Sequence, residues 1–77
     1  MLNRVISRMQ DLDKADIARM SNDEISQLNY EAMVEIVLAS EMPVRNIERI
    51  RTFEGETVSR LAWMARDHCR KQAASLS

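Results

Sequence analysis

The sequence contains very little of what turns, cross-links and metal sites need. Among 77 residues there are one glycine, one proline and one cysteine. So few Gly and Pro residues leave little to build the tight hairpin turns of a β-sheet, which argues against a sheet. A single cysteine excludes an internal disulfide framework, and one cysteine with one histidine excludes a conventional zinc site. We therefore expect a helical protein with no metal and no cofactor.

The sequence also shows no segment typical of a membrane span or an export signal. Apolar runs are short; residues 36–39, for example, form a run of four, whereas a membrane helix needs about 20 apolar residues. Charged residues are scattered through the first twenty positions, which is unlike a signal peptide. The sequence thus predicts a cytoplasmic protein that does not bind a membrane.

The composition, 45% apolar and 30% charged, is that of a folded domain. A chain of 77 residues is too short for more than one domain, so residues 1–77 are expected to form a single unit. A core of this size seldom supplies more than about 3–5 kcal/mol of net stability. Because no disulfide or metal is expected, association with a second copy or a partner is the available source of further stability.

Charge is unevenly distributed along the chain. Residues 1–42 hold four basic residues and eight acidic ones, a net charge of −4, whereas residues 43–77 hold seven basic and four acidic, a net of +3. Such a dipolar chain can dock on a copy of itself or offer its basic half to an acidic partner. The alternative is that both halves are ordinary solvated faces.

The spacing of apolar residues predicts several helices. A stripe on residues 2–12 indicates an amphipathic N-terminal helix, and the stripe fails at Asp13 and Asp16. We predict a break or kink near Asp13, which can cap a new turn; the alternative is that the helix continues and its apolar seam drifts. Ser21 and Glu24 form a capping-box pattern that opens a short helix, and Asn29 is a second N-cap. The stripe from Tyr30 predicts a helix to about residue 40, with Ile36 off the stripe, so we expect this helix to be covered on more than one side.

Beyond Pro43 the pattern changes. Val44, Ile47 and Ile50 repeat every three residues, which suits a short helix or a 3₁₀ segment. Residues 52–55 are the clearest linker, and a last helix is expected over about 56–72, followed by a frayed tail over 72–77. The predicted fold is an all-α bundle of four to five helices, the longest about 30–40 and 56–72. The predicted core is Val5, Ile6, Met9, Leu12, Ile25, Leu28, Met33, Val34, Val37, Leu38, Ile47, Ile50, Phe53, Val58, Leu61, Ala62 and Ala65.

Little in the sequence suggests catalysis. His68 and Cys69 are adjacent on a predicted helix, so their side chains point about 100° apart and cannot easily share a proton. Cys69 lies on the apolar stripe, where a free thiol behaves as a small hydrophobic side chain. We expect no catalytic residues, no enzyme activity and no small-molecule substrate.

The strongest candidate for binding is Trp63. On a helical wheel it falls away from the apolar stripe of the last helix, among Arg60, Arg66 and Arg70. Trp and Arg are the residue types enriched at binding hot spots, so we predict that these four residues contact a partner protein or a second copy. The alternative is that Trp63 packs under the N-terminal helix of its own chain with arginine stems over it.

A second prediction concerns DNA. Residues 30–40, the turn at Pro43 and residues 44–51 can form a helix-turn-helix that presents Arg45, Asn46 and Arg49 to a groove, with Arg60, Arg66 and Arg70 on phosphates. Against it, the second helix would have only about two turns. The calculated pI of 5.8 is also low for a nucleic-acid-binding domain. Nucleic acid is therefore the less favoured partner.

The segment at residues 61–72, LAWMARDHCRKQ, resembles the closing helix of some small bacterial helical proteins of unassigned activity. That resemblance covers about a sixth of the chain and implies only a helical domain. The main functional hypothesis is a non-enzymatic protein–protein interaction module that self-associates through the Trp63 face. The alternative is a small helix-turn-helix-like DNA-binding regulator.

Overall fold

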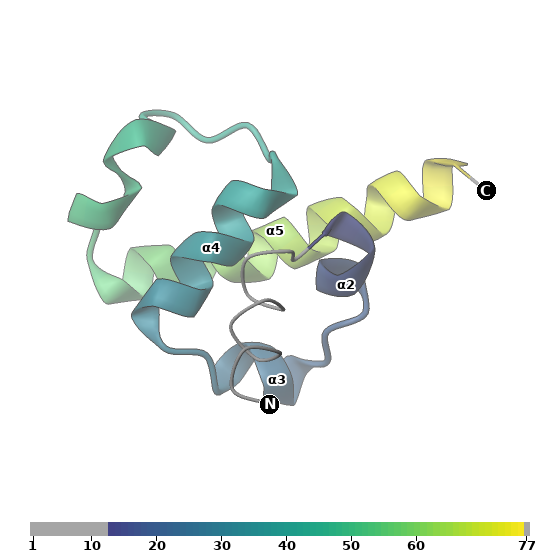
Figure 1. Cartoon of the computed structure of the whole chain (residues 1–77), viewed down its shortest axis with the longest axis horizontal. Helices are drawn as coiled ribbons and strands as arrows, with labels where there is room; N and C mark the ends of the chain where they lie inside the picture. The colour runs from purple at the N-terminus through teal and green to yellow at the C-terminus, as the bar shows by residue number, and fades with distance from the viewer. Residues whose placement is uncertain (1–12, 77) are drawn as a thin grey trace, which may run out of the picture.

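The computed structural model describes residues 13–76, and the regular elements within this range are all helical (Figure 1). In chain order they are α2 (Lys14–Ala18), α3 (Asn22–Ser26), α4 (Tyr30–Ser40), the 3₁₀ helix η1 (Ile47–Thr52) and α5 (Gly55–Leu76). The predicted all-α fold is confirmed. The predicted N-terminal helix, with core candidates Val5, Ile6, Met9 and Leu12, lies outside the described residues.

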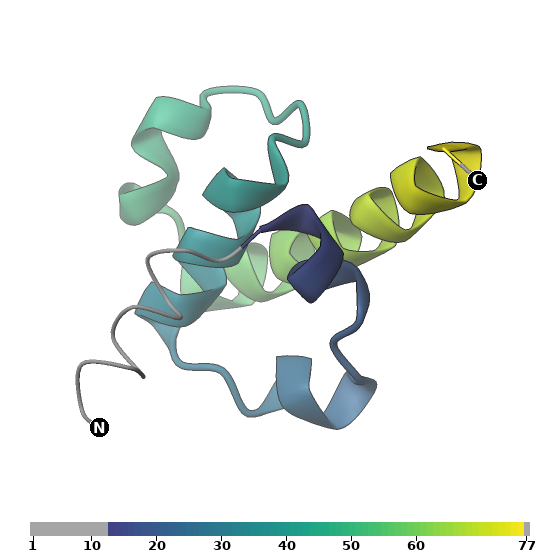
Figure 2. The same cartoon turned by 45° about the vertical axis from the view of Figure 1, so that its right-hand side comes forward.

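Two helices dominate the packing. The most extensive contacts join α4 to α5, and the next most extensive join α2 to α5, with α4 crossing the first half of α5 and α2 lying against its second half (Figure 2). The core lies where these three helices and η1 meet. Its buried side chains are Ile17, Val34, Ile36, Val37, Ile50, Val58, Ala62, Ala65 and Cys69.

Helix α4 is covered on more than one side, as predicted, because Val34 and Ile36 are both buried. The placement of Leu38 in the core is wrong, because its side chain is 37% exposed. Leu38 follows Glu31 by seven residues and Glu35 by three, so it shares their solvated side of the helix. The predicted core also omitted Ile17, which is fully buried.

Side-chain caps begin helices α2, α3 and α4. The Asp13 carboxylate accepts from the backbone N–H of Asp16 (2.9 Å), so the predicted break at Asp13 is the start of α2. Ser21 and Glu24 form the predicted capping box, with reciprocal hydrogen bonds of 3.1 and 2.9 Å. Asn29 caps α4 through the N–H of Ala32 (2.8 Å). These caps satisfy N–H groups that the first turn leaves unpaired.

The segment after α4 is tightly turned. Helix α4 ends at Ser40, and Glu41 then adopts a left-handed conformation (φ 55°) before Pro43. Of the triplet Val44, Ile47 and Ile50, the two isoleucines lie in the 3₁₀ helix η1, one of the two predicted forms, and Val44 precedes it. Helix α5 begins at Gly55 and continues to Leu76, beyond the expected end near residue 72.

Candidate protein-interaction site on helix α5

Trp63 lies at the border between the buried and exposed sides of α5, and its side chain is half-buried. The guanidinium carbon of Arg66 is 5.0 Å from the centroid of the indole ring. This is a cation–π distance, and the arginine is one turn further along the helix on the side that faces the core. One face of the indole is therefore covered by a side chain of its own chain.

Arg66 is itself 5% exposed, which is unusual for an arginine. Its Nη1 donates to the backbone oxygen of Met20 (3.3 Å) and to Oδ1 of Asn22 (2.6 Å), while Nη2 lies 3.5 Å from the Asp67 carboxylate. Its Nε is buried without a hydrogen-bond partner among the described residues. Arg66 thus holds the α2–α3 connection against α5 and fixes the position of the indole.

Arg70 has a related role one turn further along. Its Nε donates to the backbone oxygen of Ala18 (2.7 Å) and its Nη2 to that of Met20 (2.9 Å). The last carbonyl groups of a helix have no partner within it and carry partial negative charge, so an arginine is a suitable cap. Arg70 therefore caps the carboxyl end of α2 at Ala18, and both arginines bind the carbonyl of Met20 just beyond it.

Arg60 and Met64 lie on the outer side of α5. Arg60 is exposed and pairs with Glu56 one turn earlier, at 3.6 Å between Nη2 and Oε1. Met64 is 56% exposed, more than any other large hydrophobic side chain that the structure describes. With Trp63 and Asp67 they occupy positions i, i+3, i+4 and i+7, which adjoin on a helix. We call Arg60, Trp63, Met64 and Asp67 the Trp63 ridge.

The four predicted partner-binding residues are thus all on α5 but divide into two groups. Arg66 and Arg70 hydrogen-bond within the chain, whereas Arg60 and part of Trp63 face outward. On a helical wheel of α5, Met64 lies only at the edge of the apolar stripe. Its exposure depends on where α2 and α4 cover α5, which a helical wheel does not show.

The residues predicted to read DNA lie around η1. Arg45 and Asn46 precede it, Asn46 in a left-handed conformation (φ 59°), and Arg49 lies within it; all three are exposed. The segment after the turn is a six-residue 3₁₀ helix, shorter and more tightly wound than the recognition helix of a helix-turn-helix. DNA binding by these residues stays a prediction.

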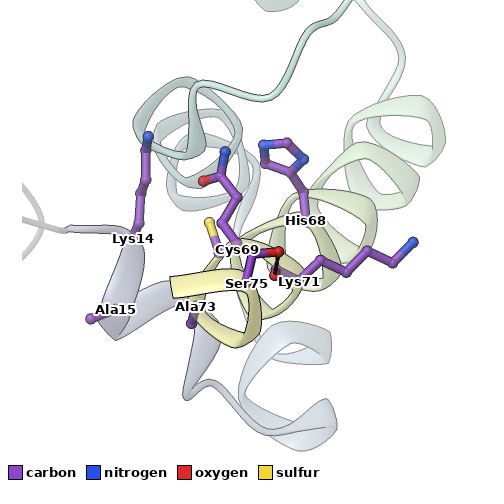
Figure 3. A pocket seen from close by; sticks show the side chains of 8 residues that line it. Lys14, Ala15, His68, Cys69, Lys71, Ala73 and Ser75 are labelled. Carbon is purple, nitrogen blue, oxygen red and sulfur yellow. Dashed lines mark hydrogen bonds between the residues drawn. The ribbon is translucent and has the colours of Figure 1, made fainter. Parts of the chain in front are cut away.

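His68 and Cys69 line a cleft of about 580 Å³ between α2 and the second half of α5. Figure 3 shows the Cys69 sulfur between Lys14 on one side and His68 on the other. Burial raises the pKa of the Cys69 thiol, and the positive charge of Lys14 acts in the opposite direction. A raised pKa leaves less of the reactive thiolate. The Lys14 ammonium pairs with Glu41 at 2.8 Å and lowers the pKa of that carboxyl group.

The described residues contain neither a metal-binding cluster nor a helix suited to cross a membrane. No group of three or more His, Cys, Asp or Glu side chains in residues 13–76 is arranged to hold a metal ion. Within the same range, no helix combines the length and the apolar character needed to cross a membrane.

No family model, curated protein or solved structure matches this chain. The assignment of a site therefore depends on the geometry of α5 and its neighbours.

Proposed function

We propose that the protein is a non-enzymatic protein–protein interaction module that self-associates through the Trp63 ridge of α5. The observation that supports this most is the pair formed by Trp63 and Met64. The indole is held in place by a buried arginine, and Met64 beside it is the most exposed large hydrophobic side chain that the structure describes.

Pre-organisation is the reason that this pair suits binding. The Arg66 guanidinium contacts the indole and is fixed by Met20 and Asn22, so Trp63 loses little conformational freedom when a partner covers it. A few residues carry most of the binding energy of an interface, and Trp and Arg are enriched among them. Burial of Trp63 and Met64 would supply the affinity, and Arg60 and Asp67 would lie at the contact as a pair of opposite charges.

The test compares two exposed hydrophobic residues on different helices. Trp63→Ala and Met64→Ala should weaken self-association in sedimentation equilibrium, the former by about thirtyfold or more. Leu38→Ala is the matched control, because Leu38 is also exposed but lies on α4. Equal affinities for all variants, or a wild-type protein that stays monomeric at every accessible concentration, would overturn the proposal.

A further inference from the structure

The charged residues on the outer side of α5 are arranged symmetrically about one point of the helix, and each has a residue of opposite charge at the same distance on the other side of that point. Around a centre between Trp63 and Met64, Arg60 lies as far towards the amino end as Asp67 lies towards the carboxyl end. Further out, Glu56 and Lys71 are related in the same way. Both pairs are exposed, and they are on the solvated side of the helix.

An antiparallel copy of the helix exchanges these positions. A two-fold axis through the centre places residue 60 of one copy opposite residue 67 of the other, and residue 56 opposite residue 71. The arginine then meets the aspartate twice, once on each side of the axis. The outer pair, Glu56 and Lys71, is also of opposite sign, so no like charges face each other in this register.

The same axis brings the apolar residues of the ridge together. Trp63 and Met64 are adjacent in sequence and lie about 100° apart on the helix, flanking the line of Arg60 and Asp67. The two-fold axis keeps each flank of the contact on the same side in both copies. Each indole therefore approaches the indole of the second copy, and each Met64 approaches its counterpart. A parallel arrangement would instead place Arg60 beside Arg60 and Asp67 beside Asp67.

Among the residues that the structure describes, none covers this side of α5. The helix buries Val58, Ala62 and Ala65 against the core, and the ridge residues Arg60, Met64 and Asp67 are exposed on the opposite side. The span from residue 56 to residue 71 is about 22 Å of helix, long enough for a helix–helix contact of several turns.

From this pattern we infer that two copies of the protein pair through antiparallel α5 helices centred between Trp63 and Met64, with Arg60 of each copy opposite Asp67 of the other. This inference rests on the proposed function, since it names the partner and the register of the Trp63 ridge.

Charge reversal on mixing tests the register. Arg60→Glu places two acidic pairs in its own homodimer, and Asp67→Arg places two basic pairs in its own, so each variant alone should associate about tenfold more weakly than wild type. When the two variants are mixed, the glutamate introduced at position 60 of one chain faces the arginine introduced at position 67 of the other. On the other side of the axis, the native Asp67 of the first chain faces the native Arg60 of the second. The mixture should therefore form a heterodimer with affinity close to that of wild type in sedimentation equilibrium.

Two controls make the result specific. Arg49→Glu makes the same charge change on η1 and leaves the ridge intact, so it should self-associate as wild type does. Its heterodimer with Asp67→Arg keeps one pair of facing arginines and should therefore be weaker than the heterodimer of Arg60→Glu with Asp67→Arg. The double variant Arg60→Glu/Asp67→Arg should self-associate again, because its charges are complementary in the antiparallel register. Circular dichroism checks that Arg60→Glu, which places two glutamates one turn apart, keeps its helix.

The outcomes separate this inference from the proposed function. If Trp63→Ala weakens association but mixing the charge variants restores nothing, the ridge is the interface and the antiparallel register is wrong. If neither Trp63→Ala nor the charge variants change association, the ridge itself is wrong. Recovery in the mixed sample and in the double variant, together with wild-type self-association of Arg49→Glu, supports the register.

Discussion

Two parts of this molecule are held together by different forces. Helices α4 and α5 pack through apolar side chains such as Val34, Val37 and Val58, all of which are buried. Helices α2 and α3 have five residues each, far fewer than the about 12–15 that an isolated helix needs to be stable in water. They depend on N-terminal caps, on Ile17 and Ile25, and on two arginines that reach across from α5.

The difference explains why the arginines of α5 do not form a single binding surface. The short helix α2 and its connection to α3 leave carbonyl groups that need donors; Arg70 binds those of Ala18 and Met20, and Arg66 binds that of Met20. Arg60, which precedes Arg66 by six residues, has no such carbonyl to bind and stays at the surface beside Glu56. Residues of one type on one helix therefore serve two purposes.

The largest effect is expected where the short and long helices share a core. Ile17 is the fully buried residue of α2, and Ile17→Ala should lower the free energy of unfolding by about 2–5 kcal/mol because it leaves a cavity against α5. Urea unfolding measures the change. Leu38→Ala should cost less than about 0.5 kcal/mol. Similar losses for the two variants would show that α2 does not pack as described.

The next effect separates the two kinds of arginine. Arg66→Ala removes two hydrogen bonds to the α2–α3 connection and should cost about 1.5–3 kcal/mol, whereas Arg60→Ala, which loses only an exposed ion pair, should stay within about 0.5 kcal/mol. The same urea titrations provide the comparison. If Arg60→Ala were the more destabilising variant, the assignment of Arg66 as the structural residue would fail.

A smaller effect is expected at the capping box of α3. Ser21→Ala removes the hydroxyl that accepts from the N–H of Glu24 and should cost about 0.5–2 kcal/mol. In return, the backbone N–H and hydroxyl of Ser21 lower the pKa of Glu24 below its ordinary 4.5. The stabilisation from this carboxylate is complete above pH 4.5 and is lost as the pH falls through the folded-state pKa.

The acid dependence can be measured with Glu24→Gln. Its unfolding free energy, followed from neutral pH to well below 4.5, should fall less than that of wild type over the acid part of the titration. Identical pH profiles for the two proteins would mean that the capping box contributes nothing through the charge of Glu24.

The smallest effect on stability is expected at Arg45 and Arg49. Both are exposed around η1, and replacing both with Ala should change the unfolding free energy by less than about 0.5 kcal/mol. The same double variant tests the DNA hypothesis. A duplex shift at low salt that weakens steeply with added salt and disappears in the variant would favour a DNA-binding regulator. Without a shift, that alternative falls.

Local signals in the sequence predicted much of the fold. The caps at Asp13, Ser21 and Asn29 are set by side chains within three residues, so they can be recognised without knowledge of the tertiary structure. The triplet spacing that ends at Ile50 likewise indicated a short helical segment, with the 3₁₀ form as one of its two alternatives. The exposure of Leu38 was not predicted because it depends on which sides of α4 its neighbours cover.

The candidate site was predicted only in part for the same reason. Trp63 and Arg60 could be placed on an outward side from the helical wheel. The burial of Arg66 could not, because its partners Met20 and Asn22 lie more than forty residues earlier in the chain. Contacts at that separation depend on the path of the chain between α3 and α5, which periodicity does not determine.

The most direct test of self-association through the Trp63 ridge is the fluorescence emission of Trp63, the one tryptophan of the chain, across a dilution series. We expect blue-shifted emission at high concentration that moves to the red on dilution, because the indole is fully covered only when two copies pair. Emission that stays the same at every concentration would contradict it, since the surroundings of the indole would then be those of the monomer throughout.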